Sequence, residues 1–254
     1  MNQQEVLRIL RKVGAVIVDS HIVYTSGLHG TAYVNKDAVY PHTKEISDLC
    51  RAIAGQFVDD GVEVVIAPAV GGVILSQWTA HHLSELTGRE VLGIYAEREY
   101  RERILFEPYK NSKPVFLKLP FSGPDGEPSE VSILKSQKII LREEEFSFVV
   151  KRDYDKLIAG KNVLVVEDIL TTGGSVKSVV EATRVLGGNI VGLGVICNRG
   201  GVTPKDVANV PKLTALVNVK LDAWYETACP LCDQNVPINT NVGHGREFLA
   251  RKQK

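Results

Sequence analysis

The chain has 254 residues, which is long enough to bury a sizeable core, and α/β chains of this length often form one domain. Lysine and arginine total 30 and aspartate and glutamate also total 30, so nothing in the net charge indicates a nucleic-acid or membrane partner, and a small-molecule partner is the default. No apolar run reaches transmembrane length, and the N-terminus has mixed polarity rather than a signal-peptide core, so we expect a cytoplasmic protein.

The first sixty residues predict two helices separated by a short β segment. Apolar residues recur at helical spacing over residues 4–14 and again over residues 43–60. Between them, residues 15–43 alternate in polarity as strands do, and the sequence SGLHG interrupts this alternation. We therefore expect two short strands around a glycine turn.

A repeating βα pattern follows. Apolar runs predict strands at residues 62–67, 91–95, 163–166, 190–196 and 213–219, and helical patterns occupy residues 73–86 and 175–186. Strands separated by helices imply a parallel sheet with right-handed crossovers. The predicted fold class is therefore α/β, with a central parallel sheet flanked by helices.

Two segments depart from this pattern. Residues 96–160 open with the charged sequence EREYRER, contain five prolines from Pro108 to Pro128, and include the apolar runs VFLKLPF, KIIL and FSFVV. We expect a mobile loop here that leads into a β-rich insertion, over about residues 97–150. Residues 226–254 show little periodicity, so we expect an irregular ordered segment whose basic tail frays.

The stretch at residues 162–175, NVLVVEDILTTGGS, carries the clearest chemistry. Its apolar strand ends in Glu167 and Asp168, and ligands of parallel sheets bind beyond the carboxyl ends of the strands. Gly173 and Gly174 let backbone amides face an anion at the start of the next helix, and three hydroxyls add donors: Thr171, Thr172 and Ser175. The cradle suits a phosphate monoester, and the acids suit a ribose diol, bound directly or through magnesium and its waters. The ligand indicated is a ribose 5-phosphate, and the simpler interpretation is a buried strand followed by an ordinary capped helix.

The sequence VVEDILTTGGS resembles the phosphoribosyl diphosphate binding motif of type I phosphoribosyltransferases. Other segments resemble parts of the orotate phosphoribosyltransferases within that family. YTSGLHGTAYVNKD resembles the hood over the base, PAVGG the loop around diphosphate, AERE the start of the catalytic loop, and CNRGG the arginine segment that faces orotate. CPLC followed by VPIN is similar to the tail of one subgroup, so the resemblance covers nearly the whole chain.

This resemblance implies a fold, an activity and an assembly. It implies a single type I phosphoribosyltransferase domain over residues 1–254, with an N-terminal hood over about residues 1–42. The implied reaction transfers phosphoribosyl from phosphoribosyl diphosphate to orotate, with Mg²⁺ as cofactor, and gives orotidine 5'-monophosphate and diphosphate in pyrimidine (UMP) biosynthesis. A homodimer with shared active sites is also implied. Two alternatives stay open: a phosphoribosyltransferase for another base, and a non-catalytic regulator that senses phosphoribosyl diphosphate.

The resemblance also implies roles around the phosphate and ribose. Glu167 and Asp168 are expected to be catalytic residues that hold the ribose hydroxyls, with Asp168 binding magnesium through water. Residues 171–175 are expected to hold the 5-phosphate. Arg98 is the expected catalytic cation for the departing diphosphate charge. The segment after Arg98 is longer than the catalytic loop of the family, so no loop lysine is assigned.

Two further parts complete the expected site. Gly71 and Gly72 are expected to wrap diphosphate with backbone amides, although a tight βα turn would use the same glycines. Arg199 can clamp the orotate carboxylate with two parallel hydrogen bonds, and the alternative is a surface salt bridge. The remaining orotate-binding residues are expected in the hood: Thr25, Ser26, Gly27 and Tyr33. Many members of the family carry a lysine at the position of Thr25.

The cysteines are too few and too scattered for a disulfide scaffold. Only Cys229 and Cys232 are paired by sequence, with the spacing of half a zinc site and His244 as a distant third ligand. A structural thiol pair is the favoured interpretation over zinc, and a second chain could supply the missing ligands.

Overall fold

The computed structural model describes residues 1–24, 26–107, 114–122, 128–134, 138–219 and 222–252, with the backbone alone over the described part of residues 100–146. Two compact units make up the chain. The first consists of Met1–Arg98 and Phe148–Lys254, and the second of Glu99–Ser147. The predicted insertion, at about residues 97–150, encloses this second unit.

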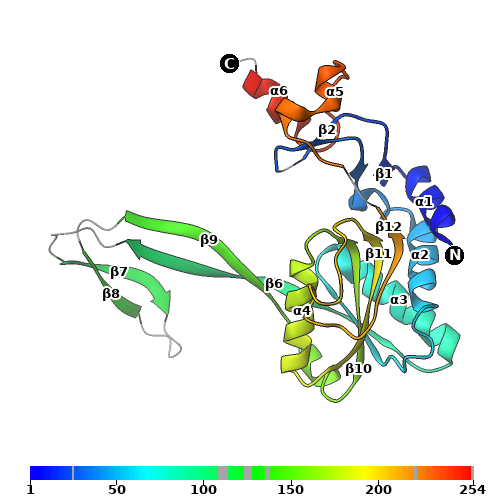
Figure 1. Cartoon of the computed structure of the whole chain (residues 1–254). Coiled ribbons are helices and arrows are strands. Elements are labelled where there is room, and N and C mark those ends of the chain that lie inside the picture. The colour runs from blue at the N-terminus through cyan, green and yellow to red at the C-terminus, as the bar shows by residue number, and fades with distance from the viewer. Residues whose placement is uncertain (25, 108–113, 123–127, 135–137, 220–221, 253–254) are drawn as a thin grey trace. The chain divides into compact units, whose positions relative to one another are not determined.

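A six-stranded sheet forms the centre of the fold (Figure 1). In spatial order its strands are β12 (Leu213–Asn218), β11 (Asn189–Asn198), β10 (Asn162–Leu170), β5 (Val64–Pro68), β6 (Leu92–Glu107) and β9 (Lys138–Val149). The pairs from β12 through β6 are all parallel. The predicted α/β class with a mostly parallel central sheet is confirmed.

Both faces of this sheet are covered. Leu164 and Val166 of β10 belong to one apolar cluster and Val163 and Val165 to another, and alternate residues of a strand point to opposite faces. The first cluster includes residues of α1 (Gln3–Lys12), α2 (Thr43–Ala54) and α3 (Gly71–Thr87), and the second includes α4 (Gly174–Val185). The continuous apolar runs of the strands therefore reflect burial on two sides.

The second helix is shorter than its pattern predicts. It ends at Ala54 rather than at residue 60, and Phe57 is fully buried in the turns that follow. Gly192 and Gly194 of β11 make room for this packing, because a Cβ on either glycine would lie 2.5 Å from the Phe57 or Ile53 side chain. Phe57 therefore packs against β11 from the turns that follow the helix.

The hood combines N-terminal and C-terminal residues. Antiparallel pairs join β1 (Val16–Ile17) to β4 (Tyr33–Val34), and β2 (Ile22–Val23) to β3 (His29–Gly30). The C-terminal part contributes η3 (Glu226–Ala228), α5 (Pro230–Asp233) and α6 (Gly245–Lys252). The predicted fraying of the tail is wrong for α6, because Phe248 is buried there against the ring of His29.

The second unit is an extended β structure. The predicted mobile loop is wrong for EREYRER, because β6 continues through this sequence to Glu107. The apolar run VFLKLPF lies in β7 (Pro114–Ser122), which pairs antiparallel with β8 (Pro128–Leu134). KIIL and FSFVV, predicted as separate short strands, fall largely within the single strand β9.

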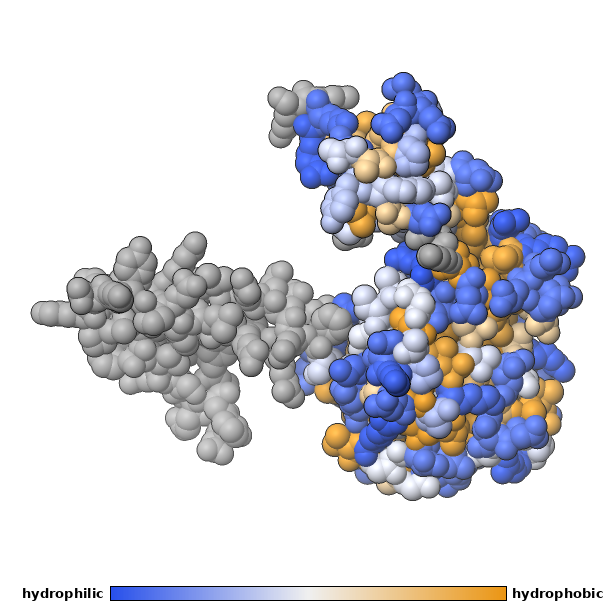
Figure 2. Space-filling view, in the orientation of Figure 1, coloured by the Kyte–Doolittle hydropathy of each residue, from blue (hydrophilic) through white to orange (hydrophobic). Residues whose placement is uncertain are grey.

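Figure 2 shows hydrophilic side chains over much of the visible face of the first unit, with apolar ones between them. This mixture agrees with a composition that is 44% hydrophobic and 24% charged. Among the described residues, the structure contains no helix that is both long and apolar enough to cross a membrane.

Candidate functional site

Three neighbouring cavities lie around the carboxyl end of β10, and Thr171 lines all three. We name them the cradle, lined by residues 169–176 with Glu167, the acid cavity, lined by Asp168, and the hood cavity, lined by Tyr24, Ser26, Leu28 and Tyr33. Their volumes are about 150, 230 and 490 Å³ respectively. Because one residue borders all three, the cavities meet at the same end of β10.

The cradle forms where β10 passes into α4. Gly173 has a φ of 78°, a left-handed conformation that glycine adopts at little cost, and α4 begins at the next residue. No side chain caps this helix, so the first backbone N–H groups of α4 are available to an anion. Thr171 and Thr172 are exposed beside them. The predicted hydroxyl and amide donors are thus brought together.

The two acids lie within the strand rather than after it. The strand β10 was predicted to end at residue 166 but continues to Leu170, because Ile169 and Leu170 still pair with β11. The backbone N–H of Asp168 donates to Oε1 of Glu167 at 3.0 Å, and the N–H of Ile169 donates to Oδ1 of Asp168 at 2.6 Å. Both carboxylates are therefore held by the backbone and are nearly buried.

Asp168 has two further partners from the end of the hood. Its Oδ2 lies 3.2 Å from Nζ of Lys36, and the hydroxyl of Tyr40 donates to the same oxygen. Burial alone would lower the pKa of Lys36, but the charge and hydrogen bond of Asp168 more than offset this and raise it. Burial and then the Asp168 charge raise the pKa of Tyr40. Lys36 therefore stays cationic and Tyr40 stays a donor.

Glu167 has a different electrostatic state. Burial raises the pKa of Glu167 to about 8, and the neighbouring Asp168 charge contributes in the same direction. At pH 7 most molecules therefore hold a proton on Glu167, while Lys36 balances Asp168. The pair of acids consequently presents little net negative charge to a phosphate in the cradle.

The PAVGG turn approaches the same carboxylate. A Cβ on Gly71 would overlap the Tyr40 hydroxyl and lie 3.0 Å from Oδ2 of Asp168. A Cβ on Gly72 would lie 2.6 Å from the Cβ of Ala67. Neither glycine lines the three cavities described above, but neither position has room for a side chain. The backbone of the turn at Gly71 therefore packs directly against the carboxylate of Asp168.

Arg199 stands between two of the cavities. It lines both the hood cavity and the acid cavity, as does Tyr33. The backbone N–H groups of Arg199 and Gly200 both donate to the carbonyl of Leu170, at 2.9 and 3.0 Å. A Cβ on Gly200 would overlap the carbonyl oxygen of Thr171, so this segment lies directly on the turn after β10.

The hood cavity has aromatic and polar walls. Tyr24, Ser26 and Tyr33 line it, and the Tyr24 hydroxyl donates to the carbonyl of Ala32 at 2.7 Å. Gly27 is in the turn between β2 and β3 with a φ of 79°, and it is not among the lining residues. Thr25, also expected to bind orotate, lies outside the described residues.

A family model described as a phosphoribosyl transferase domain matches residues 37–224 of this chain. This chain belongs to the phosphoribosyltransferase family. The resemblance to the phosphoribosyltransferase family, predicted from the sequence, is thereby confirmed.

Two curated phosphoribosyltransferase relatives illustrate the similarity. The chain is 32% identical over 238 residues to the orotate phosphoribosyltransferase of Desulforamulus reducens, covering 93% of this chain and 95% of that protein. It is 31% identical over 238 residues to the orotate phosphoribosyltransferase of Pelotomaculum thermopropionicum, with the same two coverages.

A solved phosphoribosyltransferase structure shares the fold. The orotate phosphoribosyltransferase of Mycobacterium tuberculosis aligns with a TM-score of 0.53 at 18% identity, covering 85% of this chain and 95% of that chain. The type I phosphoribosyltransferase fold predicted from the sequence is confirmed.

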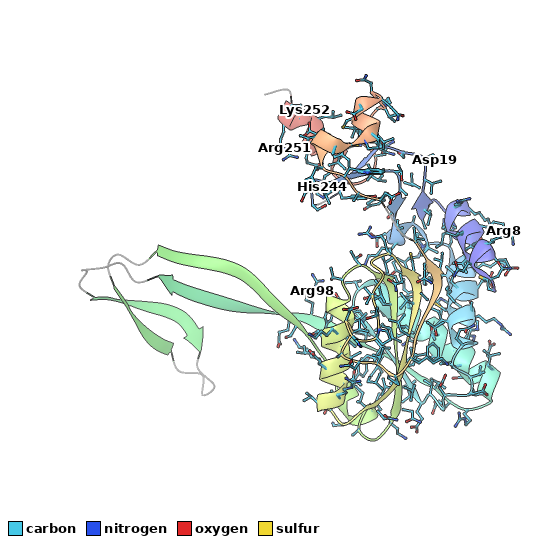
Figure 3. The ribbon with its side chains drawn as sticks, in the orientation of Figure 1. Arg8, Asp19, Arg98, His244, Arg251 and Lys252 are labelled. Atoms are coloured by element: carbon cyan, nitrogen blue, oxygen red, sulfur yellow. The ribbon has the colours of Figure 1, made fainter. Side chains whose placement is uncertain are left out.

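Arg98, expected as a catalytic cation of this phosphoribosyltransferase, lies on β6 (Figure 3). Its guanidinium carbon is 5.7 Å from the centre of the Phe148 ring, and Arg98 is not among the residues that line the three cavities. The role of Arg98 in catalysis stays a prediction.

The sequence interpretation missed Lys36 and Tyr40. Lys36 stands near the end of the hood sequence YTSGLHGTAYVNKD, and a cation close to a ligand-covering segment was the available signal. Tyr40 had no local signal, because its partner Asp168 is 128 residues away in sequence. The C-terminal segment also contributes unpredicted walls to the hood cavity: Ala223, Gly243 and His244.

Proposed function

We propose that this protein is an orotate phosphoribosyltransferase, which transfers phosphoribosyl from phosphoribosyl diphosphate to orotate. The observation that carries the proposal is the set of three cavities that share Thr171 as a lining residue. The cradle suits a 5-phosphate, the acid cavity a ribose, and the hood cavity a flat base. The names of the relatives in Desulforamulus and Pelotomaculum support the same activity.

Arg199 supports orotate as the base. Orotate carries a carboxylate that uracil and the purines lack, and a planar guanidinium binds a carboxylate through two parallel hydrogen bonds. Arg199 borders both the hood cavity and the acid cavity, so in the proposed complex it would lie next to a base whose ribose is beside Asp168. Ser26 and Tyr33 would contact the rest of the base.

Magnesium fits the residues at the acid cavity. Magnesium prefers oxygen ligands and keeps several of its waters, and Asp168 lines the acid cavity with a carboxylate. In the proposal Asp168 holds the ion through water, and the backbone of Gly71 and Gly72 faces the diphosphate. When bound, the ion neutralises part of the diphosphate charge.

The residues would accelerate the reaction by positioning and charge. The bond from the anomeric carbon to the diphosphate oxygen breaks, and the oxygen leaves with the electron pair. N1 of orotate forms the new bond and gives up its proton to water. The ribose passes through an oxocarbenium-like state, which needs fixed geometry more than a covalent nucleophile. Glu167 and Asp168 would hold the ribose hydroxyls, residues 171–175 the 5-phosphate, and Arg98 the departing charge.

The test is turnover with a panel of bases. Purified protein is mixed with phosphoribosyl diphosphate, magnesium and one base at a time, and diphosphate release is measured together with the nucleotide product. We expect turnover with orotate and little with uracil, adenine, guanine or hypoxanthine. Turnover with a purine instead would assign the enzyme to another base, and binding of phosphoribosyl diphosphate without turnover of any base would indicate a regulator.

We further propose a homodimer with shared active sites in the cytosol. The cytosolic location is supported by the free thiols of Cys50 and Cys197, which a reducing compartment maintains. The dimer is tested by mixing an Asp168→Asn variant with a variant that carries Arg98→Ala, Arg101→Ala and Arg103→Ala. Random exchange makes about half of the dimers mixed, each with one intact site of two, so activity should approach about a quarter of wild type. Exchange shown by tagged pull-down without returning activity would contradict shared sites.

A further inference from the structure

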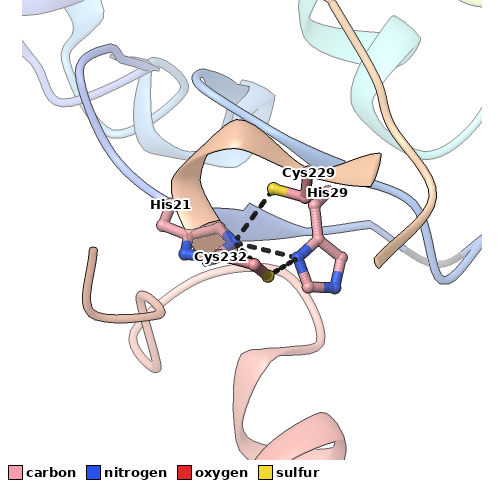
Figure 4. Close-up of side chains that lie close together, drawn as sticks. All are labelled: His21, His29, Cys229 and Cys232. Atoms are coloured by element: carbon pink, nitrogen blue, oxygen red, sulfur yellow. Dashed lines mark hydrogen bonds between the residues drawn. The ribbon is translucent and has the colours of Figure 1, made fainter. Parts of the chain in front are cut away.

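Two histidines and two cysteines converge in the hood, apart from the three cavities. One nitrogen of His21 and of His29 and the sulfur atoms of Cys229 and Cys232 all lie within 4.8 Å of one another. Figure 4 shows the four side chains directed toward a common centre. The first three residues are buried and Cys232 is partly buried. Four groups that bind soft divalent metals are therefore enclosed at one place.

Backbone hydrogen bonds hold the four residues in position. His29 in β3 exchanges backbone hydrogen bonds with Trp224, both at 2.8 Å, and His21 accepts one from Asn239 at 2.8 Å. The cysteines stand at the start of α5 and within it, and the N–H of Asp233 donates to the carbonyl of Cys229 at 3.2 Å. Two segments about 200 residues apart in sequence thus present their ligands from a folded framework.

The distances match the edges of a tetrahedral zinc site. Ordinary zinc–nitrogen and zinc–sulfur bonds imply about 3.5 Å between a nitrogen and a sulfur ligand and about 3.3 Å between two nitrogens. Nε2 of His21 lies 3.6 and 3.7 Å from the sulfurs of Cys229 and Cys232, and Nδ1 of His29 lies 3.4 Å from Cys232. The two nitrogens are 2.9 Å apart, so this one edge must lengthen by about 0.4 Å to admit the ion.

Hydrogen bonding within the group cannot account for these contacts. Nδ1 of His21 lies 2.7 Å from the carbonyl oxygen of Val236, which only accepts, so Nδ1 carries the hydrogen and Nε2 of the neutral ring has one lone pair. His29 and both cysteines approach that single lone pair. One lone pair makes one good hydrogen bond, whereas a metal ion at the centre would use all four groups. A histidine that donates its other N–H to a carbonyl is also the usual arrangement at zinc.

The ring of His29 is held in place by packing rather than by a hydrogen bond from its second nitrogen, Nε2. Among the described residues, Nε2 of His29 is buried without a hydrogen-bond partner. The ring packs edge-on against Phe248 of α6, with centroids 4.8 Å apart. A buried ring nitrogen without a hydrogen bond is costly unless another interaction of the same ring offsets the cost, and metal binding through Nδ1 is such an interaction.

We propose that His21, His29, Cys229 and Cys232 bind one structural Zn²⁺ that fastens the C-terminal segment to the hood. Two thiolates and two neutral imidazoles complete a tetrahedron and leave no open position, which is the pattern of a structural site. A two-iron cluster with the same residue types places its cysteines and histidines on different irons, which does not fit nitrogen and sulfur atoms in contact. The ion would hold the walls of the hood cavity, because the lining residues Tyr24 and Leu28 lie between the two histidines in sequence.

A second group of metal-binding side chains provides the control. His81, His82 and Glu85 lie together on α3, but both ring nitrogens of His82 already have partners, Ser47 at 2.8 Å and Glu85 at 3.1 Å. His81→Gln tests whether metal binds there instead. Cys50→Ala removes a buried thiol outside the proposed site and controls for loss of a cysteine.

The first experiment measures the zinc content of the purified protein by inductively coupled plasma mass spectrometry. We expect about one zinc per chain in the wild type, in Cys50→Ala and in His81→Gln, and at least about a tenfold loss in Cys232→Ser. A chelator should lower the melting temperature of the wild type and of Cys50→Ala, and should not change that of Cys232→Ser. Zinc that stays in Cys232→Ser, or that is lost in His81→Gln, overturns the proposal.

A second measurement decides the question if Cys232→Ser does not fold. Reduced wild-type protein is stripped of metal and titrated with Co²⁺. The site should show thiolate-to-cobalt charge-transfer absorption and intense tetrahedral bands that saturate at one equivalent, and excess Zn²⁺ should remove them. The proposal fails if the wild type contains no zinc and one equivalent of cobalt produces no thiolate absorption.

Discussion

Removing the Arg199 side chain should weaken orotate far more than phosphoribosyl diphosphate. Arg199 borders the hood and acid cavities, and its backbone N–H is fixed to the carbonyl of Leu170 at 2.9 Å, so Arg199→Ala should leave the loop in place. A desolvated, charge-assisted pair with the orotate carboxylate contributes about 2 to 4 kcal/mol, which corresponds to about a 30- to 900-fold loss.

The assay is initial-rate kinetics with each substrate varied in turn. We expect the loss in kcat/KM for orotate, with a much smaller change for phosphoribosyl diphosphate. Arg199→Lys keeps the charge without the planar fork and should recover only part of the loss, and Arg8→Ala, an exposed arginine on α1, should match wild type. Equal weakening of both substrates by Arg199→Ala would refute the placement of the orotate carboxylate.

Three other substitutions test the site's remaining parts. Asp168→Asn should keep the fold and lower turnover by about 100-fold, because the side-chain amide carries no charge to pair with Lys36. Near wild-type turnover at saturating magnesium would contradict this prediction. Native Glu167, with its pKa raised from 4.5 to about 8, holds a proton that unfolding releases, so wild-type stability falls as pH rises through this window. Glu167→Gln should abolish that fall. The variant's free energy of unfolding relative to wild type, measured by chemical denaturation, should therefore rise between pH 5 and pH 8 by at most about 5 kcal/mol. If the difference in free energy of unfolding between variant and wild type is the same at both pH values, Glu167 does not hold a buried proton. Gly200→Ala should lower the free energy of unfolding by about 1 to 3 kcal/mol, because the added Cβ pushes this segment away from Thr171. If neither the melting temperature nor the KM for phosphoribosyl diphosphate changes, the contact is unimportant.

The sequence could predict those parts of the fold that depend on nearby residues. The strand and helix around the cradle follow from an apolar run, two glycines and the start of an apolar helix, all within residues 162–186. The acids were also assigned correctly to the carboxyl edge of the sheet, but β10 extends through them because of pairing with β11. Strand ends therefore depend on neighbours that periodicity does not report.

The partners of functional groups were the harder part. Lys36 and Tyr40 reach Asp168 across about 130 residues, and His21 lies beside Cys229 across 208 residues. No spacing rule connects such distant positions, because the tertiary fold alone brings them together. The two cysteines of CPLC could be recognised in the sequence as half of a zinc site, but the two histidines beside them could not. His244, the histidine that the sequence suggested as a third ligand, lies outside the group of four.

The most direct test of the central claim is the structure of the protein with orotidine 5'-monophosphate. One nucleotide should occupy all three cavities, with its phosphate on residues 171–175, its ribose beside Asp168, and the base carboxylate on the Arg199 guanidinium. A phosphate outside the cradle, or a base bound outside the hood cavity, would contradict the account.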